Sequence, residues 1–444
     1  MSWNSLLRLA IPLFLTAAVL VAYPLPLNSK VYIDINAPGG RRFPIAIPHF
    51  SFEAGPPEDA PLARSVAETV GVDLSSTRVF EVINRRSYLV NPLKVGPGGA
   101  GIDFHDWTTI GAEALVSGTL RINGDQARLT GKVYDTINGS LILGREYTGS
   151  KADIRRMAHR FANQTVEAFT GARSIFLTRI AATGSGDGNK EIYVMDYDGY
   201  NRRPITQNGT INVAPSWTPD GRGILYTSYK AGNPDLYLYD LVKGQDRVLS
   251  RRFGLNLGAS WSPRENFIAL TVSTDKGDSE ISLIDDHGAV VQRLTGSWGI
   301  NVSPSWSPDG KQIAFASSRG GTPQIYIMDR TGKGVRRLTY EGNYNTSPAW
   351  SPAGDKIAYT SRVAGRFQIA VINPDGGGRQ ALTSSAGDNE DPSWSPDGRY
   401  IAFGSTRDGG KSQIYILDVR GGSTVRLQSP IEMKDPAWSP WLPD

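Results

Sequence analysis

The chain has 444 residues, a formal net charge of +4 and no cysteine, with 49 glycines and 28 prolines. The absence of cysteine excludes disulfides, thiol nucleophiles and thiolate metal sites. The small net charge lacks the basic footprint of a nucleic-acid-binding protein, so no nucleic acid is expected as a partner. Length and turn-rich composition favour a globular protein of two or three domains.

The first 27 residues have the features of an export signal. Arg8 precedes an apolar run over residues 9–22, and Pro24 and Pro26 follow it. Such a run matches the hydrophobic region of a secretory signal peptide and is short for a membrane span. The sequence therefore predicts a signal peptide over residues 1–27 with an uncertain cleavage site. If it is not cleaved, the segment is a marginal membrane anchor.

Residues 28–170 are predicted to form a small α/β domain. Alternating apolar residues predict strands, helical spacing of apolar residues predicts helices, and Asn-Gly pairs mark turns between the later strands. The expected strands are 30–35, 43–48, 79–83, 114–122, 127–134 and 140–144, and the expected helices are 58–70, 106–115 and 152–169.

The remainder of the chain, residues 174–444, is built on a repeat. Tryptophan recurs every 44 or 45 residues within variants of the phrase Pro-Ser-Trp-Ser-Pro-Asp-Gly, at Trp217, Trp261, Trp306, Trp350, Trp394 and Trp438. Within one period, turn signals separate four short runs of strand-forming residues, which is typical of a propeller blade. We interpret the tryptophans as core residues packed between neighbouring blades.

The repeats close into a ring of six blades. Strands equivalent to residues 313–315 are expected at 175–177, 224–226, 267–269, 357–359 and 401–403. The first of these has no tryptophan strand before it, and Trp438 has no strand after it. The last tryptophan strand should therefore pair within the first blade and leave no free sheet edge. The predicted fold class is α+β: a six-bladed β-propeller preceded by a small α/β domain.

An asparagine lies five positions before each tryptophan except the last, where Met433 replaces it. Six-fold geometry would gather these residues around the axis at one mouth of the propeller. One reading is a turn residue that caps its own backbone; the other is a polar rim that meets a partner, with variable residues just after it. The five positions are Asn212, Asn256, Asn301, Asn345 and Asn389.

The sequence offers little for catalysis. It has four histidines, His49, His105, His159 and His287, without the spacing of a metal site, and no nucleophile-elbow motif. We therefore expect no enzyme activity, no catalytic residue, no metal and no cofactor. Two alternatives stay open: an exported propeller hydrolase or lyase, and a saccharide- or peptide-binding propeller.

The chain resembles the TolB family, the periplasmic propeller proteins of the Tol–Pal envelope system. The resemblance covers nearly the whole chain: the exported N-terminus, Val-Tyr-Ile-Asp-Ile-Asn from Val31, Phe-Pro-Ile-Ala-Ile-Pro from Phe43, the six tryptophan repeats and the Pro-Ala-Trp-Ser-Pro tail. It implies a non-enzymatic periplasmic adaptor for outer-membrane integrity and constriction during division.

The resemblance also implies two partners. An extended segment near residues 28–36 would bind the C-terminal domain of TolA, through Val31, Tyr32, Ile33, Asp34 and Ile35. The propeller mouth would bind Pal, the peptidoglycan-associated lipoprotein, and associate the protein peripherally with the outer membrane. The implied Pal-binding residues are the five asparagines with Leu255, Gly258, Val302 and Ser303, and the family pattern is more polar at Leu255, Val302 and Ser303.

Overall fold

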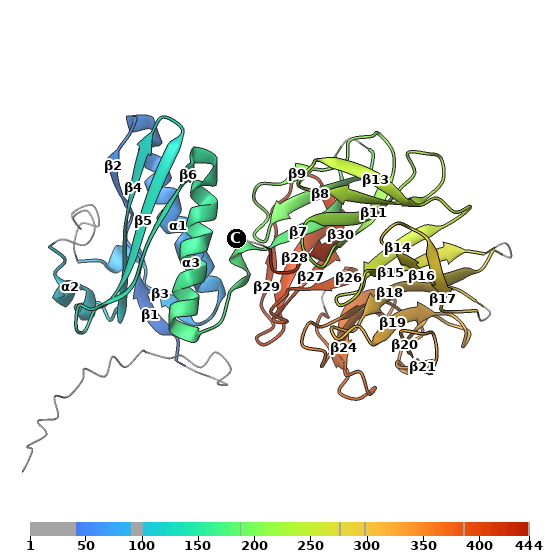
Figure 1. Ribbon diagram of the computed structural model, residues 1–444. Coiled ribbons are helices and arrows are strands. Elements are labelled where there is room, and N and C mark those ends of the chain that lie inside the picture. Colours follow the sequence, from blue (N-terminus) through green and yellow to red (C-terminus); the bar gives the residue numbers. More distant parts are fainter. Residues whose placement is uncertain are drawn as a thin grey trace, which may run out of the picture.

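The computed structural model describes residues 41–89, 101–186, 188–274, 277–296, 299–384 and 387–442 (Figure 1). Two units lie side by side in Figure 1, an α/β domain and a propeller. The expected signal peptide over residues 1–27, the strand at 30–35 and the segment 28–36 lie outside the described residues.

The N-terminal domain is a sheet covered by two helices. The strands are β1 (Phe43–Ala46), β2 (Ser51–Ala54), β3 (Phe80–Val82), β4 (Ala114–Asn123), β5 (Gln126–Asp135) and β6 (Leu141–Ser150). They run in the order β3-β1-β4-β5-β6, with β2 paired to β4. Helices α1 (Ala60–Ser76) and α3 (Ile154–Thr170) pack against each other between the sheet and the propeller (Figure 1).

Local sequence explains where α3 begins and ends. Ser150 and Asp153 form a capping box around the short helix η5 (Lys151–Asp153) that leads into it. Gly171 ends the helix with φ 71°, a left-handed conformation that favours glycine. The predicted apolar face is confirmed: Met157, Phe161 and their neighbours are buried. Burial of this face against the sheet stabilises the helix more than its intrinsic propensity does.

Three predicted elements have wrong bounds. The helix expected at 58–70 is α1 (Ala60–Ser76), which continues past the predicted end. The helix expected at 106–115 is α2 (Phe104–Thr109), because Asp103 caps it and Ala114 already begins β4. The strand expected at 140–144 extends through Ser150 as β6, because it pairs with β5 along nearly all of its length. For β6, pairing with the neighbouring strand, which single-strand periodicity does not contain, sets the boundary.

The propeller has six four-stranded antiparallel sheets. Five blades each consist of consecutive strands. They are β10 (Asn212–Trp217), β11 (Gly223–Ser228), β12 (Asp235–Asp240) and β13 (Gln245–Ser250); β14 (Asn256–Trp261), β15 (Phe267–Ser273), β16 (Ser279–Asp285) and β17 (Val290–Arg293); β18 (Asn301–Trp306), β19 (Gln312–Ser317), β20 (Gln324–Asp329) and β21 (Arg336–Arg337); β22 (Asn345–Trp350), β23 (Ile357–Val363), β24 (Arg366–Ile372) and β25 (Gln380–Ala381); and β26 (Asn389–Trp394), β27 (Tyr400–Ser405), β28 (Gln413–Asp418) and β29 (Thr424–Arg426).

The sixth blade joins the two ends of the propeller sequence. Its sheet order is β30-β7-β8-β9, formed by β30 (Glu432–Trp438), β7 (Arg179–Ser185), β8 (Glu191–Asp196) and β9 (Arg203–Pro204). Trp438 lies opposite Ile180, as Trp394 lies opposite Ile401 in the preceding blade. The predicted closure of the ring by the last tryptophan strand is confirmed.

The strand expected at residues 175–177 is wrong. These residues form a short 3-10 helix, η6 (Ile175–Leu177), and the first blade begins at Arg179. Ile175 and Phe176 are buried in the core that the two domains share. The apolar residues 175–177 resemble the repeated strand in sequence but do not form it. Ile180, which pairs with Trp438, occupies the repeat position.

The tryptophan strands form the inner wall of the propeller. Each of β10, β14, β18, β22, β26 and β30 contacts the next in this order, and β30 contacts β10, so the six surround the central axis. Five tryptophans are buried, which confirms the core interpretation, whereas Trp261 is half-buried. Their indole rings pack with apolar side chains from the adjacent blade.

Candidate functional site: the channel mouth

The six inner strands begin at one end of the central channel, which we call the mouth. The N-terminal domain contacts the opposite end of the blades. There, the hydroxyl of Tyr400 donates to the carbonyl of Ser76 at 3.2 Å, and Arg78 lies 3.4 Å from the carboxylate of Asp418. Tyr400 begins β27 and Asp418 ends β28, both at the tryptophan end of the blade. The mouth thus faces away from the N-terminal domain.

The five asparagines do not form an exposed rim. All five side chains are fully buried, at 0% exposure. The amide of Asn389 donates to Oε1 of Gln368 at 3.0 Å, and its carbonyl accepts from Ser405 and Arg407. Gln368 belongs to the preceding blade, so the asparagine joins two blades. The expected direct contact of these side chains with a partner is corrected: they hold the loops and the seams between blades.

The bridge between blades recurs with variations. The residue 21 positions earlier accepts from the asparagine amide in four of the five repeats. The reading of asparagine as a residue that caps its own loop holds in part, since several amides also donate to nearby backbone carbonyls, as Asn256 does to Arg252. The four bridging pairs are Asn212 with Glu191, Asn301 with Glu280, Asn345 with Gln324, and Asn389 with Gln368.

The sixth blade lacks this bridge. Met433 occupies the asparagine position and is buried against Gly184, where a Cβ would lie 2.9 Å from the methionine sulfur. Gln413, which is equivalent to Gln368, has a buried Oε1 without a hydrogen-bond partner. The blade that closes the ring therefore exchanges a polar bridge for an apolar contact.

Two positions after each asparagine, and after Met433 in the sixth blade, the backbone adopts a left-handed conformation with φ between 50° and 63°. A register shift in the pairing of the inner strand accompanies it in every blade. Neighbouring members lie close together: the Ser347 hydroxyl donates to Asp391 at 2.7 Å. We call this set the channel ring, and it comprises Ala214, Gly258, Ser303, Ser347, Asp391 and Asp435.

One side of the channel ring is acidic. Burial raises the pKa of Asp391 to about 7, and the neighbouring charge of Asp435 adds to this effect. Burial also raises the pKa of Glu390, with the charges of Asp388 and Asp435 as further causes. Two carboxylates in such proximity resist simultaneous ionisation, because each destabilises the charge of the other. The ring therefore changes its charge close to neutral pH.

Exposed apolar side chains lie just before the asparagines. Ile211, Ile300 and Tyr344 occupy the position directly before Asn212, Asn301 and Asn345, and all three are exposed. Leu255 holds the equivalent place in its blade and is half-buried, while Phe253 beside it is 96% exposed. We call Ile211, Phe253, Leu255, Ile300 and Tyr344 the apolar arc.

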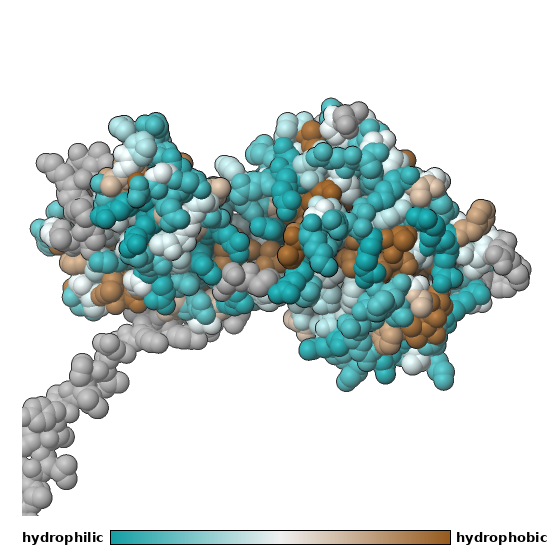
Figure 2. Space-filling view, turned by 45° about the horizontal axis from the view of Figure 1, so that its top comes forward, coloured by the Kyte–Doolittle hydropathy of each residue, from teal (hydrophilic) through white to brown (hydrophobic). Residues whose placement is uncertain are grey.

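Sequence reasoning identified one member of this arc, Leu255, and missed the rest. The variable residues after each asparagine were the predicted contacts, and of these Val302 and Ser303 are half-buried. The available signal was an apolar residue before asparagine in four consecutive repeats. The predicted TolA-binding residues Val31, Tyr32, Ile33, Asp34 and Ile35 lie outside the described residues. The visible propeller surface is largely hydrophilic with separate hydrophobic patches (Figure 2).

The architecture defines a two-domain β-propeller protein with an α/β domain at one end and the channel mouth at the other. Among the residues that the structure describes, none of the helices has the length and apolar character needed to cross a membrane. A family model described as the TolB beta propeller domain matches residues 166–442, and the TolB amino-terminal domain model matches residues 31–142. The chain belongs to the TolB family.

Individual relatives agree with this assignment. The Tol-Pal system protein TolB of Desulfosudis oleivorans is 43% identical over 286 residues, 64% of this chain and 65% of its own length. A TolB homolog of Chlorobium luteolum is 36% identical over 324 residues, 70% of this chain and 71% of its own. The chain thus spans about two thirds of the length of these relatives. The crystal structure of TolB from Acinetobacter baumannii is similar at a TM-score of 0.76 and 27% identity, covering 90% of this chain and 98% of that one.

Proposed function

We propose that this protein is a non-enzymatic periplasmic adaptor of the Tol–Pal system. It binds Pal at the channel mouth and the C-terminal domain of TolA through residues 28–36, and it supports outer-membrane integrity and constriction during division. Membership of the TolB family supports this proposal, together with the Tol-Pal name that its relatives carry.

The observation that carries the Pal site is the apolar arc. Exposed apolar side chains that gather on one rim mark interaction surfaces in soluble proteins. Phe253 and Tyr344 have the aromatic character of residues that dominate binding energy at interfaces. The channel ring beside the arc supplies acidic groups, so the complementary partner surface presents apolar side chains flanked by basic ones.

The decisive experiment is isothermal titration calorimetry of the purified mature protein with Pal from the same organism. We expect Phe253→Glu and Ile300→Glu to weaken binding at least tenfold, because each places a charge in an apolar contact. The matched control is Val242→Glu: Val242 is 78% exposed but lies in the turn after β12, at the other end of the blade. Equal affinity for all variants would refute the mouth assignment.

The TolA part of the proposal has a separate test. Deletion of residues 28–36 should abolish binding of the TolA C-terminal domain while the propeller still unfolds at the wild-type temperature. The Tyr32→Asp and Ile33→Asp variants test the same segment with smaller changes, because an added strand uses alternate side chains for specificity. Retained TolA binding after the deletion would show that another surface carries it.

A further inference from the structure

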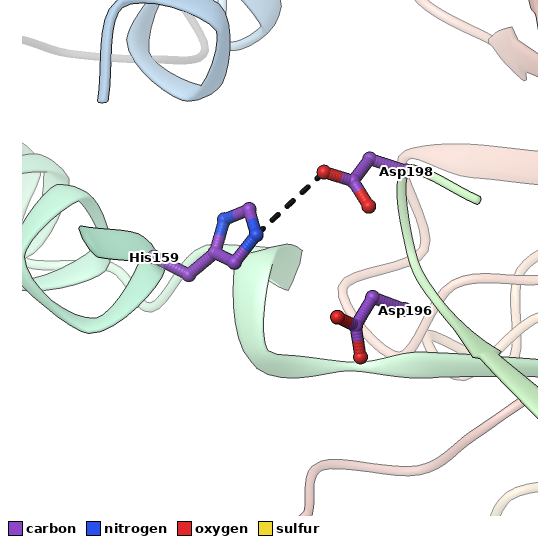
Figure 3. Close-up of side chains that lie close together, drawn as sticks. All are labelled: His159, Asp196 and Asp198. Carbon is purple, nitrogen blue, oxygen red and sulfur yellow. Dashed lines mark ion pairs between the residues drawn. The ribbon is translucent and has the colours of Figure 1, made fainter. Parts of the chain in front are cut away.

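A buried cluster of charged groups joins the two domains. His159 of α3 lies beside Asp73 of α1, and across the junction Tyr197 and Asp198 follow strand β8. Figure 3 shows the imidazole ring of His159 pointing toward Asp198, with Asp196 nearby. The His159 side chain is only 2% exposed and that of Asp73 is completely buried.

Both ring nitrogens of His159 face carboxylates. Nδ1 lies 2.8 Å from Oδ2 of Asp73, and Nε2 lies 3.6 Å from Oδ2 of Asp198. A neutral imidazole carries one N–H and one lone pair. Either neutral tautomer therefore directs a lone pair at a carboxylate inside a buried site, which is unfavourable. The imidazolium form donates a hydrogen bond to Asp73 and places its positive charge beside Asp198, which lies beyond hydrogen-bond distance of Nε2.

Protonated His159 balances the charges of the cluster when both carboxylates are ionised, although burial raises the pKa of Asp73. Asp73 accepts from the Tyr197 hydroxyl at 2.6 Å through Oδ1 and faces His159 through Oδ2. Asp198 pairs with Arg155, whose other guanidinium nitrogen donates to Thr69. Two carboxylates and two cations then give a neutral set. Burial alone would lower the pKa of His159, but the charge and hydrogen bond of Asp73 and the charge of Asp198 outweigh burial and raise it.

The remaining titratable groups around the cluster already have partners. Asp196, at the end of β8, pairs with Arg179 of β7 at 3.8 Å and accepts from the amide of Asn201 at 2.5 Å. Tyr400 of β27 interacts electrostatically with Tyr197. His159, Asp196 and Asp198 have residue types that could hold a metal ion. Because Arg155 and Asn201 already occupy the two carboxylates, the arrangement favours a proton over a metal.

We propose that protonated His159 is a pH-dependent connection between the N-terminal domain and the propeller. A group with a raised folded-state pKa contributes stability that is fully present below its unfolded value of 6.5 and is lost as pH rises through the folded value. Deprotonation places a lone pair against Asp198 or Asp73 and loosens the junction.

Loosening has a defined structural consequence. A solvent-exposed cleft of about 1260 Å³ lies between the domains, and Tyr197, Asp198 and Arg155 form part of its wall. Few polar contacts cross the junction elsewhere among the described residues, chiefly those of Arg78 and Tyr400. Loss of the His159 connection therefore weakens the polar contacts along this cleft at alkaline pH. The apolar core that the two domains share and the separate sheet of each domain remain, so the junction loosens without unfolding either domain.

The test uses the full chain. Only four histidines are present, so proton NMR follows each ring from pH 5 to pH 10. Hydrogen exchange of α1, α3 and the β8–β9 turn, corrected for intrinsic rates, reports the junction. We expect His159 to titrate above 6.5 and junction protection to fall through the same pH range. Each tenfold loss of protection corresponds to one unit of difference between the folded and unfolded pKa values.

Three variants test whether His159 causes the pH dependence of the junction. His159→Gln should remove the pH dependence, whereas His287→Gln should keep it, because His287 is exposed beside Asp286 on another blade. Asp198→Asn should move the transition to lower pH. Titration of His159 below 6.5, or junction protection that does not change with pH, overturns the proposal. A transition that requires zinc, and disappears with a chelator, replaces the proton with a metal and also overturns it.

Discussion

The indole nitrogen of Trp438 donates a hydrogen bond to the hydroxyl of Thr178 at 2.9 Å, although 260 positions separate the two residues. This contact lies in the blade that joins both ends of the propeller, where β30 pairs with β7. We expect Trp438→Phe to lower the free energy of unfolding by about 1–2 kcal/mol, because the buried Thr178 hydroxyl loses the donor from which it accepts and keeps only its own bond to the Ile175 carbonyl. Urea denaturation measures the change.

Trp261→Phe is the matched control for Trp438→Phe. Trp261 holds the same repeat position, but it is half-buried and, within the described residues, its indole nitrogen makes no hydrogen bond. Trp261→Phe should therefore lower the free energy of unfolding less than Trp438→Phe does. Equal losses in the two variants would mean that the Trp438–Thr178 hydrogen bond adds nothing to closure.

Alanine substitutions at two glycines distinguish the cost of backbone strain from the cost of a steric clash. Gly288 and Gly232 have nearly the same φ, +91° and +86°. A Cβ on Gly288 would lie 1.7 Å from the carbonyl oxygen of Leu249 in the preceding blade, whereas one on Gly232 would meet nothing within 4 Å. We expect Gly232→Ala to cost about 1 kcal/mol from strain alone. Gly288→Ala should cost about 3 kcal/mol or more, because the two blades must move apart. Thermal denaturation of both variants shows whether the close approach of Gly288 to the Leu249 carbonyl contributes to stability.

Asp391 should make the stability of the propeller depend on pH. Its pKa is about 7 in the folded protein against an ordinary 3.8. The unfolded chain loses this proton first, so stability falls as pH rises from about 4 to 7. Asp391→Asn should therefore raise the free energy of unfolding on the order of 2–4 kcal/mol at pH 8 and leave it unchanged at pH 3. The asparagine carbonyl can still accept from Ser347.

Asp309→Asn is the control for Asp391→Asn. The Ser307 hydroxyl and the Lys311 amide hold the pKa of Asp309 below its usual value, which is the opposite direction. This variant should gain no stability at pH 8. Denaturation curves at several pH values compare the two, and a pH-independent effect of Asp391→Asn would show that the carboxyl is not held protonated.

The hydrogen bonds between blades predict that equivalent asparagines contribute unequally to the free energy of unfolding. Asn389 uses both ends of its amide, donating to Gln368 and accepting from Ser405 and Arg407. Asn345 donates to Gln324, but its buried carbonyl oxygen has no partner. We expect Asn389→Ala to cost about 2–4 kcal/mol, because the buried Gln368 and Ser405 and the half-buried Arg407 each lose a partner, and Asn345→Ala to cost less. Guanidinium denaturation ranks them; the reverse order would contradict the assigned role of the amide carbonyl.

Sequence periodicity predicted the blades correctly because each repeat contains its own strands and turns. The tryptophan interval, the glycine turns and the missing strand after Trp438 were sufficient to predict six blades and their closure. The error at residues 175–177 shows the limit of such matching, since an apolar triplet fits both a strand and a buried 3-10 turn. Ile180 holds the true position, and only its pairing with Trp438 reveals this.

The candidate site was predicted less well, for a related reason. Asn301 and its equivalents recur because they join blades, and recurrence along a sequence does not show which way a side chain points. Ile211 and Ile300 attract no notice as isolated apolar residues, yet the six-fold geometry places them on one rim. The sequence likewise gave His159 no partner, because Asp73 is 86 positions away on another helix.

Local information along the chain thus determined the repeat, the number of blades and the two-domain order, since turns and strand patterns are encoded by residues close in sequence. Tertiary structure alone decided which polar residues are buried, which apolar ones are exposed, and how His159 of one domain meets Asp198 of the other. Burial and charge pairing depend on distances in space between residues far apart in the chain, and a repeat pattern does not contain those distances.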